Sequence, residues 1–258
     1  MMTHTLVFGT FIFPNATFKV QAHRMDIDTP SAATPRMDGG EVLRGSLTPR
    51  MFALNGMLWG VDRDSMHNQF ITMQRAVHNA GAGASFYYRP DRYVFAQLSQ
   101  GGMQATPRQG LYEHMLDVDI LLVAKKPYAE SIQTSSDSGS LSNSCTTKSL
   151  TPIGNYPTQP VWTIVSGATW GSLDSFRVTN VLNSNAFIFY GPMVSGQTLV
   201  IDNALGSVLM QVGLTMVDAM SLFGGNVFLQ LEPGVQNDLL VCGPTLSFSL
   251  QYRGRYYS

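Results

Sequence analysis

Charged residues are scarce in this sequence of 258 residues: they make up 13% of the chain, and the formal net charge is only -1. A protein that grips nucleic acid needs clustered lysine and arginine to neutralise phosphates, so this composition argues against such a function. Disorder is also disfavoured, because 44% of the residues are apolar. Together these features favour a folded protein whose surface is partly covered, for example by neighbouring subunits.

Cysteine is almost absent, and the two that occur, Cys145 and Cys242, lie far apart in the sequence. Neither has a CxxC partner or a nearby histidine that would indicate zinc. Because one pair cannot build a disulfide framework, we expect two reduced thiols in a protein that folds in a cytoplasm.

Long apolar runs are missing as well. The N-terminal run LVFGTFIFP is too short to cross a membrane and lacks a basic start, and later runs such as ILLVA are shorter still. The sequence therefore predicts a soluble protein without an export signal or a membrane partner.

Catalytic and metal-binding motifs are not found. The five histidines never occur as HxH or HExxH, and there is no GxSxG elbow. Gly81-Ala82-Gly83 begins like a dinucleotide-binding loop, but Phe86 occupies the third glycine position. Aspartates two apart, such as Asp117 and Asp119, are expected on one solvated face of a strand. We therefore predict no enzyme activity, no cofactor and no metal site.

One change in composition divides the chain. The segment ESIQTSSDSGSLSNSCTTKS is rich in Ser, Thr and Gly and predicts a linker at about residues 130–150. It separates an N-terminal domain, residues 1–130, from a C-terminal domain, residues 131–258.

Hydrophobic spacing indicates a mainly β fold with one helix. In the N-terminal half, DSMHNQFITMQRAVHNAGAG places Met66, Phe70, Met73 and Val77 at helical spacing, with Asp64 or Ser65 as the cap. Strand-like segments surround it, which predicts a β-sandwich or barrel-like domain with one α-helix. In the C-terminal half, strands recur at intervals of about ten residues, which is typical of an antiparallel sandwich or barrel.

Two segments of the N-terminal half are candidates for contacts between subunits. Residues 29–45 contain several turn-formers and predict an exposed loop or arm, although a disordered surface excursion explains them equally well. The run YYRPDRYVF predicts a hairpin or a surface buried between subunits, rather than a nucleic-acid site, since no basic groove surrounds it in the sequence. The candidate residues are Arg36, Met37, Asp38, Val42 and Leu43 in the first segment, and Tyr87, Tyr88, Arg89, Arg92 and Tyr93 in the second.

The stretch LQLEPGVQNDLLVCG raises the question of whether Glu232 is a catalytic carboxylate or a turn residue. Pro233 fixes φ and Gly234 tolerates a backbone conformation that other residues resist, so the sequence predicts a turn. We expect Leu229 and Leu231 in a core, followed by the turn and a returning strand that completes a hairpin. Asn237 and Asp238 are expected to hydrogen-bond backbone amides as the chain re-enters the sheet.

The C-terminal half resembles the C-terminal domain of siphophage distal tail proteins, the Dit family. The family's ordered segments occur here as YPTQPVWTIVSG, GQTLVIDNALGSVLM, FLQLEPGVQNDLLVCG and SFSLQYRGRYY. The N-terminal half is similar to the family's ring domain, with the loop TPRMDGG, one helix and a last strand ending in LLVAKKPY. One departure is the longer turn FYGPMVSGQ, between Ile188 and Thr198.

The resemblance implies a structural virion protein rather than an enzyme. It implies a homo-hexameric ring, formed by the first domain, between the tail tube protein and the tail hub. The genome would pass the ring's lumen without specific binding, which suits a nearly neutral chain. It further implies a galectin-like second domain that carries receptor-binding or tail fibre proteins. The implied location is the phage tail tip, after assembly in the host cytoplasm.

The alternative is a carbohydrate-binding module that acts in adhesion to the host surface, because a galectin-like sandwich is also a glycan-binding scaffold. Fold alone does not transfer that activity. Trp162 lies in an apolar alternation and is expected in the core, whereas Trp170 lies in a loop and is the candidate glycan contact. A glycoside hydrolase would need two suitably placed carboxylates. None of the second half's carboxylates has a convincing partner in the sequence; they are Asp174, Asp202, Asp218, Glu232 and Asp238.

Overall fold

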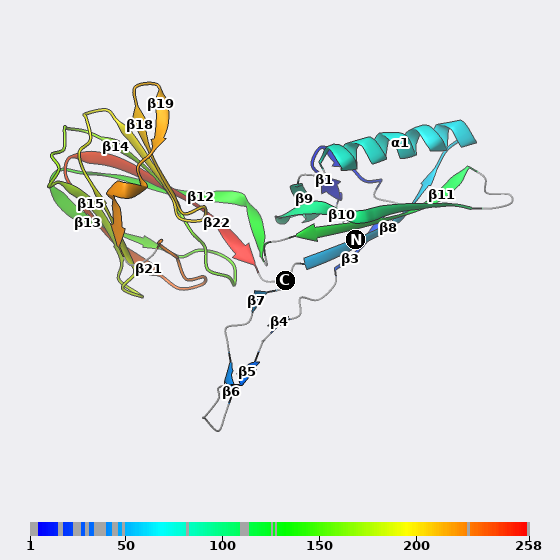
Figure 1. The fold of residues 1–258 in the computed structure, drawn as a ribbon, viewed down its shortest axis with the longest axis horizontal. Helices are drawn as coiled ribbons and strands as arrows, with labels where there is room; N and C mark the ends of the chain where they lie inside the picture. Colours follow the sequence, from blue (N-terminus) through cyan, green and yellow to red (C-terminus); the bar gives the residue numbers. More distant parts are fainter. Residues whose placement is uncertain are drawn as a thin grey trace. The chain divides into compact units, whose positions relative to one another are not determined.

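The chain divides into two compact units, Met1–Ala129 and Glu130–Tyr257, and is built mainly of antiparallel strands with one α-helix (Figure 1). The computed structural model describes residues 5–14, 18–22, 27–28, 31–33, 40–42, 46–47, 50–80, 83–108, 114–124, 126, 128–225 and 228–256, with backbone alone for the strand residues between 21 and 49. The mainly β fold class with one helix, predicted from the sequence, is confirmed.

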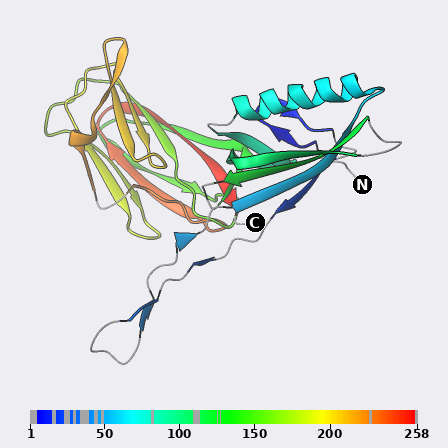
Figure 2. The ribbon, with the colours of Figure 1, turned by 45° about the vertical axis from the view of Figure 1, so that its right-hand side comes forward.

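The first unit is an antiparallel sheet covered on one face by a helix, as Figures 1 and 2 both show. Its strands run in the order β3-β8-β11-β10, and β9, β1 and β2 continue the pairing from β10. The bounds are β1 Val7–Phe8, β2 Phe11–Ile12, β3 Lys19–Ala22, β8 Arg50–Trp59, β9 Ala84–Arg89, β10 Arg92–Pro107 and β11 Met115–Ala124.

Helix α1 spans Arg63–Asn79, in the segment where helical spacing predicted it. Met66, Met73 and Val77 are buried, and they belong to the same core as the inward-facing residues of β8 and β11. The N-cap is Asp62 rather than the expected Asp64 or Ser65, because its side chain accepts a hydrogen bond of 2.7 Å from the Ser65 amide.

Residues 27–47, which include the segment predicted as an exposed loop or arm, contain two antiparallel ladders (Figure 2). β4 (Ile27–Asp28) pairs with β7 (Ser46–Leu47), and β5 (Ser31–Ala33) pairs with β6 (Gly40–Val42). We call this hairpin the arm. Val42 lies in β6 and is described by its backbone alone, and the other candidate residues, Arg36, Met37, Asp38 and Leu43, lie outside the described residues.

The second unit is a sandwich of two antiparallel sheets around an aromatic core. One sheet has the order β19-β18-β17-β14-β22-β12, and the other has the order β13-β21-β15-β16-β20. The strands are β12 Ala129–Leu141, β13 Ser144–Leu150, β14 Val161–Ser166, β15 Ser175–Asn180, β16 Ala186–Tyr190, β17 Thr198–Asp202, β18 Ser207–Val212, β19 Thr215–Asp218, β20 Phe223–Gly225, β21 Asn237–Gly243 and β22 Leu246–Tyr256, with a short 3-10 helix at Met220–Leu222. Trp162 is fully buried between these sheets, as predicted.

The Ser- and Thr-rich segment forms strands β12 and β13, so the prediction of a linker at residues 130–150 is wrong. The ends of the two strands are buried at Leu141 and Leu150. Before Leu141, β12 carries a glycine opposite a large side chain of the core. A Cβ on Gly139 would lie 2.7 Å from the ring of Phe248, so the absence of a side chain there gives that ring its space.

The expectation of two reduced thiols is also wrong, because Cys145 and Cys242 form a disulfide with an S–S distance of 2.04 Å. The cause is strand register. β13 pairs with β21 over its whole length, and this pairing places the two cysteines directly opposite each other, with 4.1 Å between their Cα atoms. Their separation of 97 residues in the chain hides this proximity.

Glu232 lies in a turn with a structural purpose. Leu229 and Leu231 are buried, as expected, and Gly234 adopts a positive φ of 71°. The hairpin prediction is wrong, since Leu231 pairs with Thr158 rather than with β21. Asn237 does hydrogen-bond a backbone amide, that of Glu232 at 2.9 Å, whereas the Asp238 carboxylate accepts from the side chains of Ser149 and Gln236.

Substitution Gly234→Val should lower the free energy of unfolding of the second unit by about 1–3 kcal/mol, because a β-branched residue is strained at this φ although space is open around it. Glu232→Gln is the matched control and should stay within about 0.5 kcal/mol of wild type. Urea unfolding, followed through the fluorescence of the buried tryptophans, measures both. A stable Gly234→Val protein would contradict the role given to this turn.

Removal of the disulfide in a Cys145→Ala, Cys242→Ala double variant should lower the free energy of unfolding of the second unit by about 2–4 kcal/mol, since the bridge constrains the unfolded chain. Reductant should destabilise the wild type to a similar extent and leave the double variant unchanged. Mass spectrometry after alkylation under non-reducing conditions checks the bond itself. Two alkylated cysteines in the folded, unreduced protein would disprove it.

Candidate functional site

The predicted hairpin in YYRPDRYVF is confirmed: β9 and β10 pair antiparallel, with Arg89 opposite Arg92 across the turn. Asp91, within the turn, binds the Arg92 guanidinium at 2.6 and 3.0 Å. This hydrogen bond holds the pKa of the Asp91 carboxyl below its ordinary value. The Asp91 side chain is exposed and that of Arg92 is mostly buried, and their contact holds the turn.

The aromatic residues of this hairpin do not form one surface. Tyr88 packs toward the core, 5.1 Å from the ring of Phe52, and the exposed Arg89 lies 5.9 Å from the ring of Tyr88. Tyr87 and Tyr93 instead contact each other, with ring centroids 5.4 Å apart. Alternation along the strands therefore divides the three candidate tyrosines between core packing, for Tyr88, and a smaller, half-buried pair, Tyr87 and Tyr93.

An exposed apolar groove lies where β8 ends and α1 begins. Its two adjoining hollows have volumes of about 740 and 330 Å³. Trp59 and Val61 are strongly exposed here, at 58% and 89%, and Ile12 adds a third exposed apolar side chain. Asp62 and Asp64 lie at the helix end of the groove. The only local signal for this site in the sequence is the apolar pair on either side of Gly60, next to the helix cap.

The predicted solvated face of β11 is confirmed. Leu116, Val118 and Ile120 are buried, and the intervening aspartates lie on the other side. Asp117 accepts from Arg108 at 2.8 Å, and Asp119 accepts from Asn55 at 2.5 Å. Among the residues that the structure describes, no cluster of three or more histidine, cysteine or acidic side chains could hold a metal ion.

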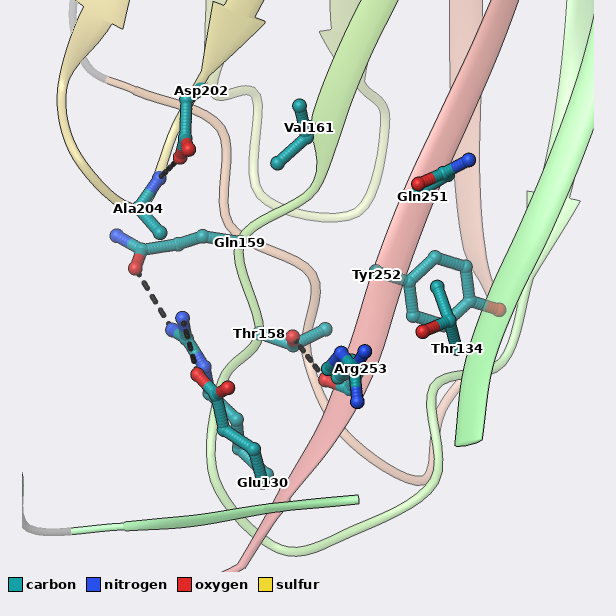
Figure 3. A pocket seen from close by; sticks show the side chains of 11 residues that line it. Glu130, Thr134, Thr158, Gln159, Val161, Asp202, Ala204, Gln251, Tyr252 and Arg253 are labelled. Carbon is teal, nitrogen blue, oxygen red and sulfur yellow. Dashed lines mark hydrogen bonds and ion pairs between the residues drawn. The ribbon is translucent and has the colours of Figure 1, made fainter. Parts of the chain in front are cut away.

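A polar pocket of about 240 Å³ opens on the outer face of the β17-β14-β22-β12 sheet in the second unit (Figure 3). Strand register places Asp202, Val161 and Gln251 in one row across β17, β14 and β22. Their strand neighbours Ile201, Trp162 and Leu250 are buried, so this row faces outward. The complete lining is Glu130, Thr134, Thr158, Gln159, Val161, Asp202, Ala204, Gln251, Tyr252, Arg253 and Arg255.

The charged side chains of this pocket have partners within the protein, and Figure 3 shows those of Glu130 and Asp202. Arg255 lies 3.5 Å from the Glu130 carboxylate and donates to Gln159 at 2.8 Å. Arg253 donates to two backbone carbonyls of β12 at 3.1 Å. Asp202 accepts, through one carboxylate oxygen, from the amides of the following turn at 2.8 and 3.0 Å. These contacts hold the charged side chains of the pocket lining in position.

Trp170, the candidate glycan contact, is buried at 1% exposure, so the expectation of an exposed ring is wrong. The loop between β16 and β17 explains this. The Trp170 amide donates to the Met193 carbonyl at 2.8 Å, and Met193 is itself buried in the same core. This loop thus covers the tryptophan, whose ring packs in the core.

The carboxylates of the second unit have structural partners. Asp174 accepts from the Gly171 amide at 2.6 Å, and Asp218 accepts from the Met220 amide at 2.9 Å. Hydrogen bonds from Ser149 and Gln236 lower the pKa of the Asp238 carboxyl. These contacts hold turns and strand edges, and they do not create the acid and base pair that glycoside hydrolysis needs.

The helix in the described part of the chain is not long and apolar enough to cross a membrane.

These features define a class: a mainly β protein of two compact units, an antiparallel sheet covered by one helix and a sandwich of two antiparallel sheets. No protein-family model matches the chain, and no curated protein matches it. Among solved structures, the crystal structure of the Dit protein of phage SPP1, described as a paradigm of the hub adsorption apparatus in phages that infect Gram-positive bacteria, matches with a TM-score of 0.70 and 12% identity. The match covers 97% of this chain and 98% of that one.

Two baseplate structures match less closely. The phage p2 baseplate in its activated conformation with Sr gives a TM-score of 0.45 at 8% identity, over 95% of this chain and 90% of that one. The phage P2 baseplate in its activated conformation with Ca gives 0.41 at 10% identity, over 90% of each chain. The match to the SPP1 Dit protein alone shows that the chain has that protein's fold, which confirms, at the level of the fold, the resemblance noted in the sequence.

Substitution Trp170→Ala should lower the free energy of unfolding by about 3–5 kcal/mol, because it leaves a cavity in the aromatic core. Trp170→Phe is the control and should cost less, since the indole N–H makes no hydrogen bond within the described residues. Thermal unfolding followed by circular dichroism distinguishes them. An alanine variant as stable as wild type would show that the ring is exposed after all.

Proposed function

We propose that this chain is a distal tail protein, a structural component of a siphophage tail tip. The observation that carries the proposal is the near-complete match of both units, in one chain, to the SPP1 Dit protein. A single shared domain would say little about function, because common β folds serve many purposes. A shared succession of two different units over 97% of the chain is more restrictive.

The first unit is the proposed ring-forming part, and the ring is proposed to be a homo-hexamer. A closed ring needs a heterologous interface, in which one surface of each copy meets a different surface of the next. The groove at β8 and α1 suits one side of such an interface, because Trp59, Val61 and Ile12 are apolar and exposed there. The arm and the Tyr87–Tyr93 pair are the further candidates for contacts between copies.

The ring is proposed to lie between the tail tube protein and the tail hub, with the genome passing through its lumen. A nearly neutral chain supports this, since each basic residue that neutralised a phosphate would add affinity for the passing DNA. The second unit, proposed to be galectin-like, would carry receptor-binding or tail fibre proteins. The protein would be assembled in the host cytoplasm and act in the virion, without enzyme activity or a cofactor.

The ring is tested by native mass spectrometry and by negative-stain imaging of the purified chain, alone and mixed with its tail tube protein. We expect a hexameric ring with a central hole. Substitutions Trp59→Ser and Val61→Ser together should weaken assembly by roughly 30-fold or more, because each removes apolar area that assembly would bury.

The control for this pair is Leu173→Ser, which removes an even more exposed apolar side chain from the second unit. It should leave assembly unchanged. A wild-type chain that stays monomeric at micromolar concentration, even with the tube protein present, would refute the ring. A ring that forms normally in the Trp59, Val61 double variant would remove the groove from the interface.

A further inference from the structure

The polar pocket of the second unit has no place in the proposed assembly, and we infer that it is a binding site for a neutral polyhydroxyl ligand, namely one hexose unit of a glycan. The inference goes beyond the tail role and does not depend on it. All residues that line the pocket belong to the second unit, so the site is complete within one copy of the chain. Its volume of about 240 Å³ suits a single small ring rather than a drug-sized molecule.

The first step is the charge of the pocket. Its lining contains two acidic side chains, Glu130 and Asp202, and two basic ones, Arg253 and Arg255, so its formal charge is zero. The basic groups already bind acceptors of the protein at 2.8–3.5 Å. An anion would therefore meet the two carboxylates without a vacant cationic partner, and a cation would meet the two guanidinium groups. Neutral ligands avoid both penalties.

The second step is the pattern across the sheet. Asp202, Val161 and Gln251 occupy neighbouring strands in one register row, so the two polar groups flank an apolar floor. Strands in a sheet lie about 5 Å apart, which places the outer members of the row about 10 Å apart. A hexose is amphipathic in the same way, because its ring faces carry C–H groups and its hydroxyls project from the rim. Val161 can contact the ring face while the polar groups reach the hydroxyls.

The third step is hydrogen-bonding capacity. The side chains of Thr134 and Gln251 make no hydrogen bonds to the described part of the chain, and the second carboxylate oxygen of Asp202 likewise has no partner there. A threonine hydroxyl and a glutamine amide each provide both donor and acceptor. A sugar hydroxyl also donates and accepts, so it can form hydrogen bonds with both the donors and the acceptors of these groups. A ligand that only accepts or only donates would leave the other kind without a partner.

The test measures binding of neutral hexoses to the full-length chain by ligand-observed NMR, with glucose, galactose, mannose and N-acetylglucosamine as probes, together with a glycan array. Glucose 1-phosphate and glucosamine are the charged counterparts. At least one neutral probe should bind, with a dissociation constant in the millimolar range for a single unit, and its charged counterparts should bind more weakly. A glycan that binds on the array while free hexoses do not would support the same site with a polymer as its source.

Substitutions Thr134→Val and Gln251→Leu remove the free polar groups at similar volume, and each should weaken binding about fivefold. Thr163→Val and Gln230→Leu are the matched controls. Thr163 lies two residues from Val161 on the same strand and face but does not line the pocket, and Gln230 is exposed elsewhere in the same unit. The controls should bind within about twofold of wild type.

Three results would overturn the inference: no neutral sugar binds in either assay, the pocket variants bind as well as the controls, or glucose 1-phosphate binds more tightly than glucose. Ring assembly measured on the same proteins separates this inference from the proposed function. The pocket variants should assemble like wild type, so a chain that forms rings without binding sugars, or binds sugars without forming rings, disproves one proposal and leaves the other standing.

Discussion

Strand register in the second unit is the constraint on which most of its features depend. Side chains alternate between the faces of a sheet, so a slip of one residue would exchange the core for the surface. The observed register buries Trp162, and because side chains alternate, it also places the neighbouring Val161 on the outer face between Asp202 and Gln251. In the opposite sheet, the pairing of β13 with β21 sets Cys145 against Cys242. Core, disulfide and pocket are therefore consequences of one set of backbone pairings rather than separate constructions.

Local sequence patterns correctly predicted the helix and the turn. They failed for strands whose position depends on pairing with residues far away in the chain. The spacing of Met66, Met73 and Val77 needs no partner to indicate a helix, and Pro233-Gly234 needs none to indicate a turn. The serine-rich segment looked like a linker because its strands contribute backbone pairing and small inner residues instead of apolar side chains. Gly139 is favourable there only because Phe248, more than a hundred residues later, fills the space above it.

The same reasoning explains which parts of the candidate sites were foreseen. The hairpin at Arg89–Arg92 was predicted because its turn and alternation are local. The pocket was not, since its row is assembled from three strands that are distant in sequence. Trp170 was misjudged because a loop position says nothing about what covers it, and here the cover comes from Met193 in a different loop. The dependence of the fold on strand pairing also explains why this chain matches the SPP1 Dit protein with a TM-score of 0.70 at only 12% sequence identity. A fold defined by pairings tolerates wide substitution as long as each face keeps its character.

The two units present surfaces of opposite character, and that difference suits different kinds of contact. The groove of the first unit exposes Trp59 and Val61, and burial of such side chains supplies the hydrophobic free energy that permanent assembly requires. The pocket of the second unit offers free hydrogen-bonding groups whose exchange with water yields little net free energy per bond. A single pocket of this kind would bind weakly and reversibly. In the proposed ring, weak sites on several copies would act together, because each first contact would raise the local concentration for the next. Strong assembly through one unit would thus turn weak recognition by the other into firm but reversible attachment.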